Sequence, residues 1–269
     1  SDMDTVTIEN NQQFANAGAD QALCSDSYQL SGSVPESGVT GTWSVQTGKA
    51  VFADANQYNT TVTGLQKGEN VLRWTLVKNG CSSYDEVTII NNSPSDAEAG
   101  IAQGLCTDST FLDAEEPAVG AGEWSIVNGY VDFEDRMDPN TRITDVANGE
   151  NLLRWTVSNQ SCSSEDTVRI TNNQVQVEAG DDQVICGYKT QLNAVAPSKG
   201  TGKWSIVRGS ATFADDESPD TEVYLLISDT TVLAWNVFYN GCQSSDSMTI
   251  VNNAPSKADA GENRVIYQN

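Results

Sequence analysis

The chain has 269 residues, of which 14 are basic and 37 acidic, and its formal net charge at pH 7 is −23. Such a negative surface repels nucleic-acid phosphates and anionic lipid, so neither is an expected partner. There is no apolar run of about 18 residues, so membrane insertion is not expected. Histidine, the commonest general base and metal ligand, is absent. The composition therefore argues against a nucleic-acid-binding or membrane-inserted protein and weighs against an enzyme.

The residue pattern predicts an all-β protein. Val, Thr, Ile, Tyr and Trp are spread through the chain among the turn formers Gly, Asn, Asp and Ser, and no long helical period is present. The first expected element is a strand over residues 4–11, whose sequence recurs from Asp85, Asp166 and Asp246. We interpret residues 1–13 as the last strand of a preceding repeat. The chain would then be part of a longer one, and a missing signal peptide would say nothing about location.

An Ala-Gly pair opens each successive repeat, and its glycines are Gly18, Gly100, Gly180 and Gly261. The resulting period of about 80 residues is longer than a solenoid unit and is sufficient for a small sandwich with its own core. The predicted domains are three complete repeats and the first strand of a following one, at residues 14–95, 96–175, 176–256 and 257–269.

The first repeat has the strand and turn pattern of a seven-stranded sandwich. We expect its strands near residues 15–23, 28–32, 41–46, 50–53, 60–65, 70–77 and 83–91.

The strand from Gly68 to Leu76 (GENVLRWTL) is the most regular element, and a close copy starts at Gly149. Its apolar residues alternate with polar ones, which is typical of a strand with one buried face. Asn79-Gly80 follows and predicts a two-residue hairpin, because both residues accept positive φ angles. The third copy is degraded, since Asp229-Thr-Thr replaces the Gly-Glu-Asn entry. Each repeat has a second tryptophan in Gly-x-Trp-Ser, and the expected core tryptophans are Trp43, Trp74, Trp124, Trp155, Trp204 and Trp235.

The motifs agree in order with those of a known repeat family. Ala-x-Ala-Gly-x-x-Gln at 15–21, an apolar strand with Ser-Gly, Gly-x-Trp-Ser at 41–44 and Asp-x-Val-Thr-Ile at 85–89 resemble PKD-like immunoglobulin-type repeats. With the cysteines and the Arg-Trp-Thr strand, the chain is most similar to tandem repeats of long Bacteroidetes surface proteins. These include gliding-motility adhesins exported by the type IX system. The resemblance implies tandem β-sandwiches in a head-to-tail rod at the cell surface, acting as an adhesin or stalk.

Each repeat has one cysteine after its opening strand and one before its closing strand: Cys24, Cys81, Cys106, Cys162, Cys186 and Cys242. Disulfides suit an extracellular array, but spacing does not choose among the 15 connectivities. In the immunoglobulin-type sandwich that the resemblance implies, the turn between the first two strands (A–B, after residue 23) and the turn before the last strand (F–G, after residue 77) lie at opposite poles, roughly 20 Å apart. We therefore favour pairs between repeats, Cys24 with Cys162 and Cys106 with Cys242. Cys81 and Cys186 would then pair with flanking repeats.

Pairing within each repeat remains the alternative, because secreted domains usually pair their cysteines internally. The three internal pairs would be Cys24 with Cys81, Cys106 with Cys162, and Cys186 with Cys242. A zinc site is not favoured, because the chain has no CxxC motif and no histidine.

Three groups of polar or aromatic residues have the composition of a functional site, but each also fits an ordinary structural role. Oxygen ligands near the repeat boundaries would suit calcium, with Asn91, Asn92, Asp96, Glu98, Asn172, Asn173 and Glu178 as candidates, but Asn and Asp also form turns. The pairs Asp135 with Asp138 and Asp215 with Asp216 would suit glycoside hydrolysis only within a cleft. Tyr188 and Phe238-Tyr239, which only the third repeat has, are candidates for a carbohydrate- or surface-binding patch.

We therefore expect a non-enzymatic stalk without a required cofactor, whose partners are neighbouring repeats and, at the surface, polysaccharide or other proteins. The alternatives are a direct carbohydrate- or surface-binding module or, less favoured, an accessory region of a glycoside hydrolase.

Overall fold

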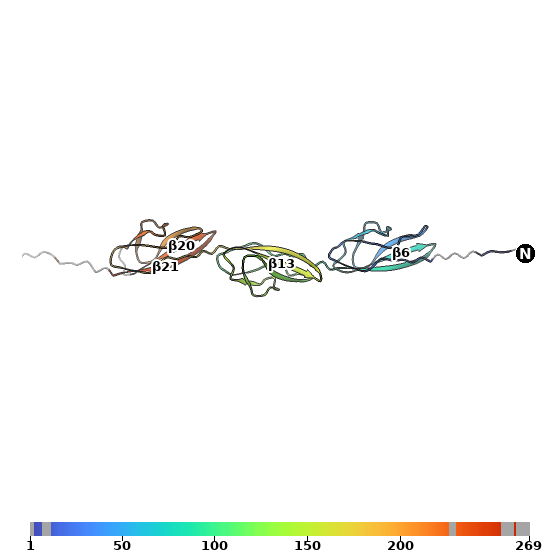
Figure 1. The fold of residues 1–269 in the computed structure, drawn as a ribbon, viewed down its shortest axis with the longest axis horizontal. Helices are drawn as coiled ribbons and strands as arrows, with labels where there is room; N and C mark the ends of the chain where they lie inside the picture. Colours follow the sequence, from blue (N-terminus) through green and yellow to red (C-terminus); the bar gives the residue numbers. More distant parts are fainter. Residues whose placement is uncertain (1–2, 7–11, 226–229, 254–260, 262–269) are drawn as a thin grey trace, which may run out of the picture.

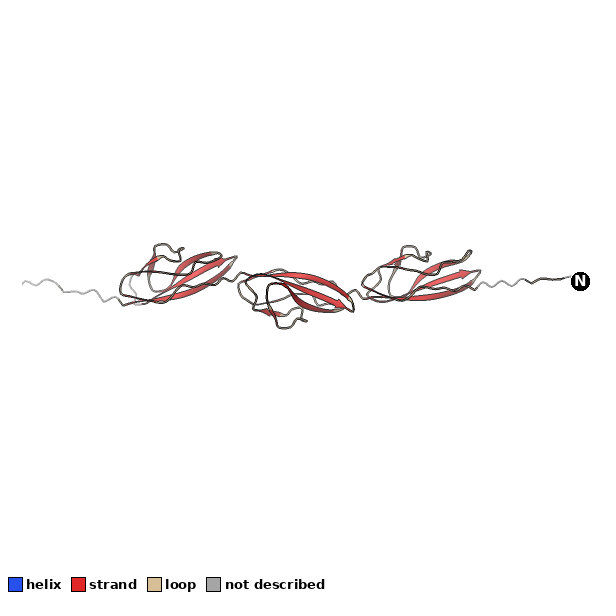
Figure 2. Cartoon of the chain, viewed as in Figure 1, coloured by secondary structure: helices blue, strands red, loops and turns tan. Residues whose placement is uncertain are grey.

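The structure is a computed structural model that describes residues 3–6, 12–225, 230–253 and 261. Strands are the only regular elements of this part, as Figure 2 shows, and they form three two-sheet units in tandem. The all-β, immunoglobulin-like fold expected from the sequence is confirmed. No helix of the described part is long and apolar enough to cross a membrane.

All three units have the same topology. The first contains β1 (Gln21–Leu23), β2 (Tyr28–Gln29), β3 (Thr40–Thr47), β4 (Val51–Phe52), β5 (Thr61–Thr63), β6 (Gly68–Lys78) and β7 (Cys81–Asn91). One sheet has the order β1-β7-β6-β3 and the other β2-β5-β4. β1 pairs with β7 in parallel, whereas the other pairs are antiparallel.

The second and third units repeat this order with β10-β13-β14-β8 over β11-β12-β9, and β15-β21-β20-β17 over β16-β19-β18. The strands of the second unit are β8 (Gln103–Leu105), β9 (Thr110–Phe111), β10 (Ala121–Asn128), β11 (Asp132–Phe133), β12 (Arg142–Thr144), β13 (Gly149–Asn159) and β14 (Cys162–Asn172). Those of the third are β15 (Gln183–Ile185), β16 (Lys189–Gln191), β17 (Thr201–Arg208), β18 (Ala211–Phe213), β19 (Glu222–Leu225), β20 (Thr230–Tyr239) and β21 (Cys242–Asn252).

The hairpin β6–β7 forms as the alternating pattern predicts. Its register is unbroken from Gly68 opposite Asn91 to Lys78 opposite Cys81. The turn residues Asn79 and Gly80 have φ angles of 47° and 83°, the left-handed values that a two-residue hairpin requires. The two longest strands of the unit therefore run from one pole to the other.

The opening strand is shorter than expected, because side chains replace part of its backbone ladder. The Asp85 carboxylate accepts a hydrogen bond from the Ala17 amide (2.8 Å), and the Asp20 carboxylate accepts one from the Thr88 amide (2.8 Å). Within the opening segment, only β1 is therefore paired with β7 as a strand, although the residues before β1 also run alongside β7. The repeated aspartates thus hold the first segment of each unit against its last strand.

Two tryptophans fill the centre of each core. All six are at most 2% exposed, and the ring centroids within a unit lie 5.0 to 5.2 Å apart. The glycine of Gly-x-Trp-Ser lies against the second ring: a Cβ added at Gly41 would lie 2.3 Å from Trp74 Cζ2, and one added at Gly122 would lie 2.0 Å from Trp155 Cζ2. The motif therefore allows the two sheets to close over both rings.

The three units follow one another along a single long axis, and the middle one is turned about that axis relative to its neighbours (Figure 1). The closing strand of a preceding repeat, expected within residues 1–13, is not visible at residues 3–6, which have no strand pairing. Residues 7–11 lie outside the described part. So does most of the opening strand expected at residues 257–269, of which only Gly261 is described.

Candidate functional site: the junctions between repeats

The first junction is covalent. Cys24 follows β1 at the end of the first unit, and Cys162 opens β14 directly after the hairpin turn of the second unit. Their sulfurs are bonded at 2.03 Å, their Cα atoms are 5.4 Å apart, and 138 residues separate them in sequence. The A–B turn of one unit therefore meets the F–G turn of the next.

The second junction repeats this arrangement. Cys106, after β8, is bonded to Cys242, the first residue of β21, with a Cα–Cα distance of 5.2 Å and a sequence separation of 136. The two bonds join the pairs that we favoured from the sequence. The pairs within repeats that the sequence left open are not formed, because the two cysteines of one unit lie at opposite ends of an 11-residue strand, about 33 Å apart.

The remaining cysteines occupy the same positions at the two outer ends of the described units. Cys81 opens β7 as Cys162 opens β14, and Cys186 follows β15 as Cys24 follows β1. Both are free and exposed, whereas Cys162 and Cys242 are 3% and 4% exposed. Docking of a neighbouring repeat therefore buries the cysteine that opens the closing strand, whereas Cys24 and Cys106, the bonded equivalents of Cys186, stay exposed.

Polar contacts accompany each bridge. At the first junction the Asn159 amide donates to the backbone carbonyl of Asn92 (3.1 Å), and at the second the Asn240 amide donates to the Asn173 side-chain oxygen (3.1 Å). Lys67 also donates to the Pro94 carbonyl in the segment between the first two units. Two of the asparagines considered for calcium, Asn92 and Asn173, thus accept hydrogen bonds across the junctions, whereas Asn91 and Asn172 donate to carbonyls of their own units.

The acidic calcium candidates, Asp96, Glu98 and Glu178, belong to no cluster of acidic side chains in the part of the chain that the structure describes. Within the described residues, no three acidic, cysteine or histidine side chains are grouped so that they could hold a metal ion. The backbone carbonyls of Glu98 and Glu178 accept hydrogen bonds from Glu115 and Val195 in their own units. Asp96 adjoins Ala97, whose amide donates to the Ser164 hydroxyl (3.0 Å). These hydrogen bonds hold the opening segment to the closing strand on one side and to the residues after β9 and β16 on the other.

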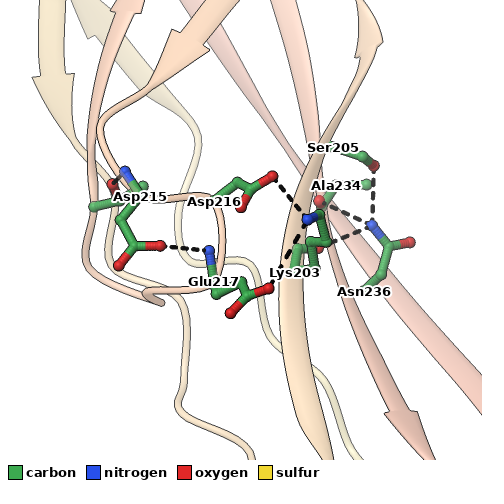
Figure 3. A network of polar contacts seen from close by, with 8 residues as sticks. Lys203, Ser205, Asp215, Asp216, Glu217, Ala234 and Asn236 are labelled. Atoms are coloured by element: carbon green, nitrogen blue, oxygen red, sulfur yellow. Dashed lines mark hydrogen bonds and ion pairs between the residues drawn. The ribbon is translucent and has the colours of Figure 1, made fainter.

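The two acids of the third unit, Asp215 and Asp216, bind neighbouring groups of their own unit (Figure 3). Asp215 Oδ1 accepts a hydrogen bond from the Glu217 amide (3.0 Å), whereas Asp216 lies 3.0 Å from Lys203 Nζ. The hydrogen bond to Asp216 and its negative charge raise the pKa of Lys203. Lys203 is also 4.0 Å from Glu217. One carboxylate therefore closes a turn and the other forms an exposed ion pair.

The acidic pair of the second unit likewise closes turns. Asp135 accepts from the Met137 amide (2.8 Å) and Asp138 from the Asn140 amide (2.9 Å). These are the backbone hydrogen bonds that Asp commonly makes in turns. Neither pair has the acid shielded in a cleft that glycoside hydrolysis requires.

The aromatic residues particular to the third unit do not form one patch. Tyr188, 65% exposed, follows Cys186 near the end of β21, whereas Phe238, 44% exposed, pairs with Gln243 near its start. About 30 Å of strand separates the two positions. Tyr239 lies beside Lys199, whose Nζ is 5.8 Å from the ring centroid.

The recurrence of Asp85, Asp166 and Asp246 in every unit favoured a structural hydrogen-bonding role, but sequence reasoning did not identify the opening segment as their partner. Asp85, Asp166 and Asp246 each accept a hydrogen bond at 2.8 Å from the alanine amide of the Ala-Gly pair. The available signal was the nearly constant spacing between these partners, 68 positions in the first unit and 67 in the other two.

No protein-family model matches the chain, and no curated protein matches it. Solved structures similar to it include several with tandem immunoglobulin domains. A mutated variant of titin domains I67–I69 is 10% identical, and the match covers 88% of this chain and 95% of that one, with a TM-score of 0.39. The insect immune protein hemolin is 11% identical; the match covers 88% of this chain and 74% of hemolin's, with a TM-score of 0.38. A structure of the eight N-terminal immunoglobulin domains of Down Syndrome Cell Adhesion Molecule is 9% identical. The match covers 90% of this chain and 36% of that one, with a TM-score of 0.48.

Proposed function

We propose that this chain is a stalk segment of a long cell-surface adhesin or filament, which holds a distal binding region away from the cell and bears tension. The observation that carries the proposal is the pair of equivalent bridges between successive units, Cys24–Cys162 and Cys106–Cys242. An enzyme or a lone binding domain does not need its modules joined in this way, whereas a rod under load does.

The partners of Cys81 and Cys186 in this proposal are repeats of the same kind, upstream and downstream. Their equivalents within the chain are bonded to neighbouring units, and both are exposed thiols here. Disulfides persist in oxidising compartments, which supports a location outside the cell. The net charge of −23 favours solubility and repulsion between rods.

As part of this proposal, the chain belongs to the PKD-like surface repeats of Bacteroidetes, which include gliding-motility adhesins exported by the type IX system. This assignment rests on the order of the motifs in the sequence. No observation favours a carbohydrate-binding module, because the exposed aromatic residues of the third unit lie far apart, and none favours a hydrolase.

The proposal is tested by two measurements on the natively oxidised protein. Digestion without reduction, after free thiols are blocked, is expected to yield peptides that link Cys24 to Cys162 and Cys106 to Cys242, with blocked Cys81 and Cys186. Small-angle X-ray scattering is expected to give a rod of about 110 Å for the three units, because each long strand of 11 residues spans about 36 Å. Peptides that link Cys24 to Cys81, or a compact particle, would refute the stalk.

A further inference from the structure

The bridges define which part of the chain transmits force, and this follows from where the cysteines lie along it. Each closing strand begins at a cysteine and runs to the far pole of its unit, and β7 and β14 continue into the next unit as its opening segment. That segment ends at the next cysteine. The path from Cys81 to Cys106 passes along two units, yet its roughly 25 residues reach at most about 80–90 Å when fully extended.

The path is extended throughout. In the second unit the Ala97 amide donates to Ser164 and the Ala99 amide to Asp166, in each case to a residue 67 positions further along the chain. β8 then pairs in parallel with the last three residues of β14, at the same offset. The opening segment therefore lies beside the closing strand over nearly the whole length of the unit, without a fold that could be pulled out.

The Cys106–Cys242 bond continues this path into the third unit. From Cys242, β21 spans the unit, and Asn253 follows its last residue. The covalent route from Cys81 to Asn253 thus contains 38 residues, namely 81–106 and 242–253, which reach at most about 125–135 Å when fully extended. Three folded units occupy about 110 Å. The route has little slack, and most residues of the three sandwiches lie beside it.

We infer that the bridges make a covalent tether of closing strand, linker and opening segment, so that unfolding a sandwich does not lengthen the rod. A second route, from the first unit through Cys24–Cys162 to Cys186, has the same construction. If flanking repeats close Cys81 and Cys186 in the same way, which rests on the proposed function, two interleaved tethers run along the array. Each skips the strands between the two cysteines of every unit.

The test is single-molecule stretching of the full chain between the Cys81 thiol and the C-terminus. Cys186→Ser leaves Cys81 as the sole free thiol for the handle. The oxidised protein is expected to show no stepwise lengthening at forces that unfold unbridged units. A variant that also has Cys24→Ser and Cys162→Ser is the matched control: it lacks one bridge but keeps the tether, so it should not lengthen either.

Adding Cys106→Ser and Cys242→Ser to that control removes the tether. Two steps are then expected, one each for the second and third units, and each should release about 240 Å, since about 80 residues extend to roughly 280 Å from a folded length of about 40 Å. Circular dichroism of each variant before stretching shows whether the sandwiches are folded.

Steps of that size in the oxidised control would overturn the tether, as would equal extension with and without Cys106 and Cys242. Such a result would leave the stalk proposal standing if scattering still gave a rod of the expected length. A compact particle in scattering, with no lengthening on stretching, would instead refute the stalk and keep the tether.

Discussion

Replacing Asn70 with alanine tests whether a buried amide closes the entrance to the long hairpin. Asn70 is fully buried, and its Oδ1 accepts hydrogen bonds from the amides of Lys49 and Gln66, both at 3.2 Å. Its Nδ2 donates to the carbonyls of Gln66 (2.9 Å), Gly68 (3.1 Å) and Ile89 (3.3 Å). One side chain thus joins three segments of the first unit.

The substitution leaves two backbone N–H groups without this acceptor, at a cost of about 1–3 kcal/mol each, partly relieved where water reaches them. We expect Asn70→Ala to lower the free energy of unfolding of the first unit by about 3 kcal/mol. Since about 1.4 kcal/mol corresponds to a factor of ten, amides of β6 and β7 should exchange with solvent deuterium about a hundredfold faster. Mass spectrometry of peptic peptides measures this for each unit separately.

Asn59→Ala is the matched control, because Asn59 is exposed and only its backbone carbonyl accepts a hydrogen bond, from Gln29. It should leave exchange in β6 and β7 unchanged. The reasoning fails if Asn70→Ala accelerates exchange there by less than tenfold, or if β13 and β14 of the second unit respond as strongly as the first unit.

Three further changes probe other contacts. Gly122→Ala places a Cβ 2.0 Å from Trp155 and should destabilise the second unit by about 3 kcal/mol in the same exchange assay, whereas Gly104→Ala, with 3.7 Å to its nearest atom, should not. Asp166→Ala removes the acceptor of the opening segment, so exchange should accelerate there by about tenfold (about 1–2 kcal/mol) and little in β13. Hydrogen bonds from Lys189 and Tyr224 lower the pKa of Glu222, so Lys189→Met should raise that pKa in an NMR titration.

The sign of the last effect sets its pH window. A carboxyl group whose pKa is lower in the folded state stabilises that state above its unfolded pKa, near 4.5, and loses the contribution as pH falls through the folded value. The raised pKa of Lys189 acts at the other extreme: its contribution is complete below about 10.5 and is lost as pH rises through the folded value. Both side chains are solvated, so high salt should weaken the pair.

The sequence predicted the long hairpins well because two local signals agree there. Leu72, Trp74 and Leu76 alternate with polar residues, and Asn79-Gly80 is suited to positive φ angles, so pattern and turn chemistry specify the same hairpin. The predicted opening strand, residues 15–23, is longer than the observed β1, Gln21–Leu23. Its composition fits a strand, but whether backbone or side-chain acceptors satisfy its amides depends on residues far away in the sequence.

The bridges show a different limit. Spacing cannot choose among the connectivities of six cysteines, and only the positions of the two turns at opposite poles separate Cys24 from Cys81. That information belongs to the fold and to the way units stack. The side-chain details of the third unit were also beyond reach: Thr231 is fully buried where the first two units have Asn70 and Asn151, and its hydroxyl has no hydrogen-bond partner among the described residues.

The contrast between Thr231 and its equivalents also bears on how an array tolerates variation. A rod that transmits force through every sandwich is as strong as its weakest unit. The Thr231 hydroxyl in β20, which is buried without a hydrogen-bond partner among the described residues, would then limit the strength of the whole rod. In a rod whose force follows the closing strands and bridges, β20 lies beside the load. Such a substitution then costs local stability but not length. In such a rod, the strands between the two cysteines of each unit would be freer to vary than β21 and the opening segments, which would transmit the tension.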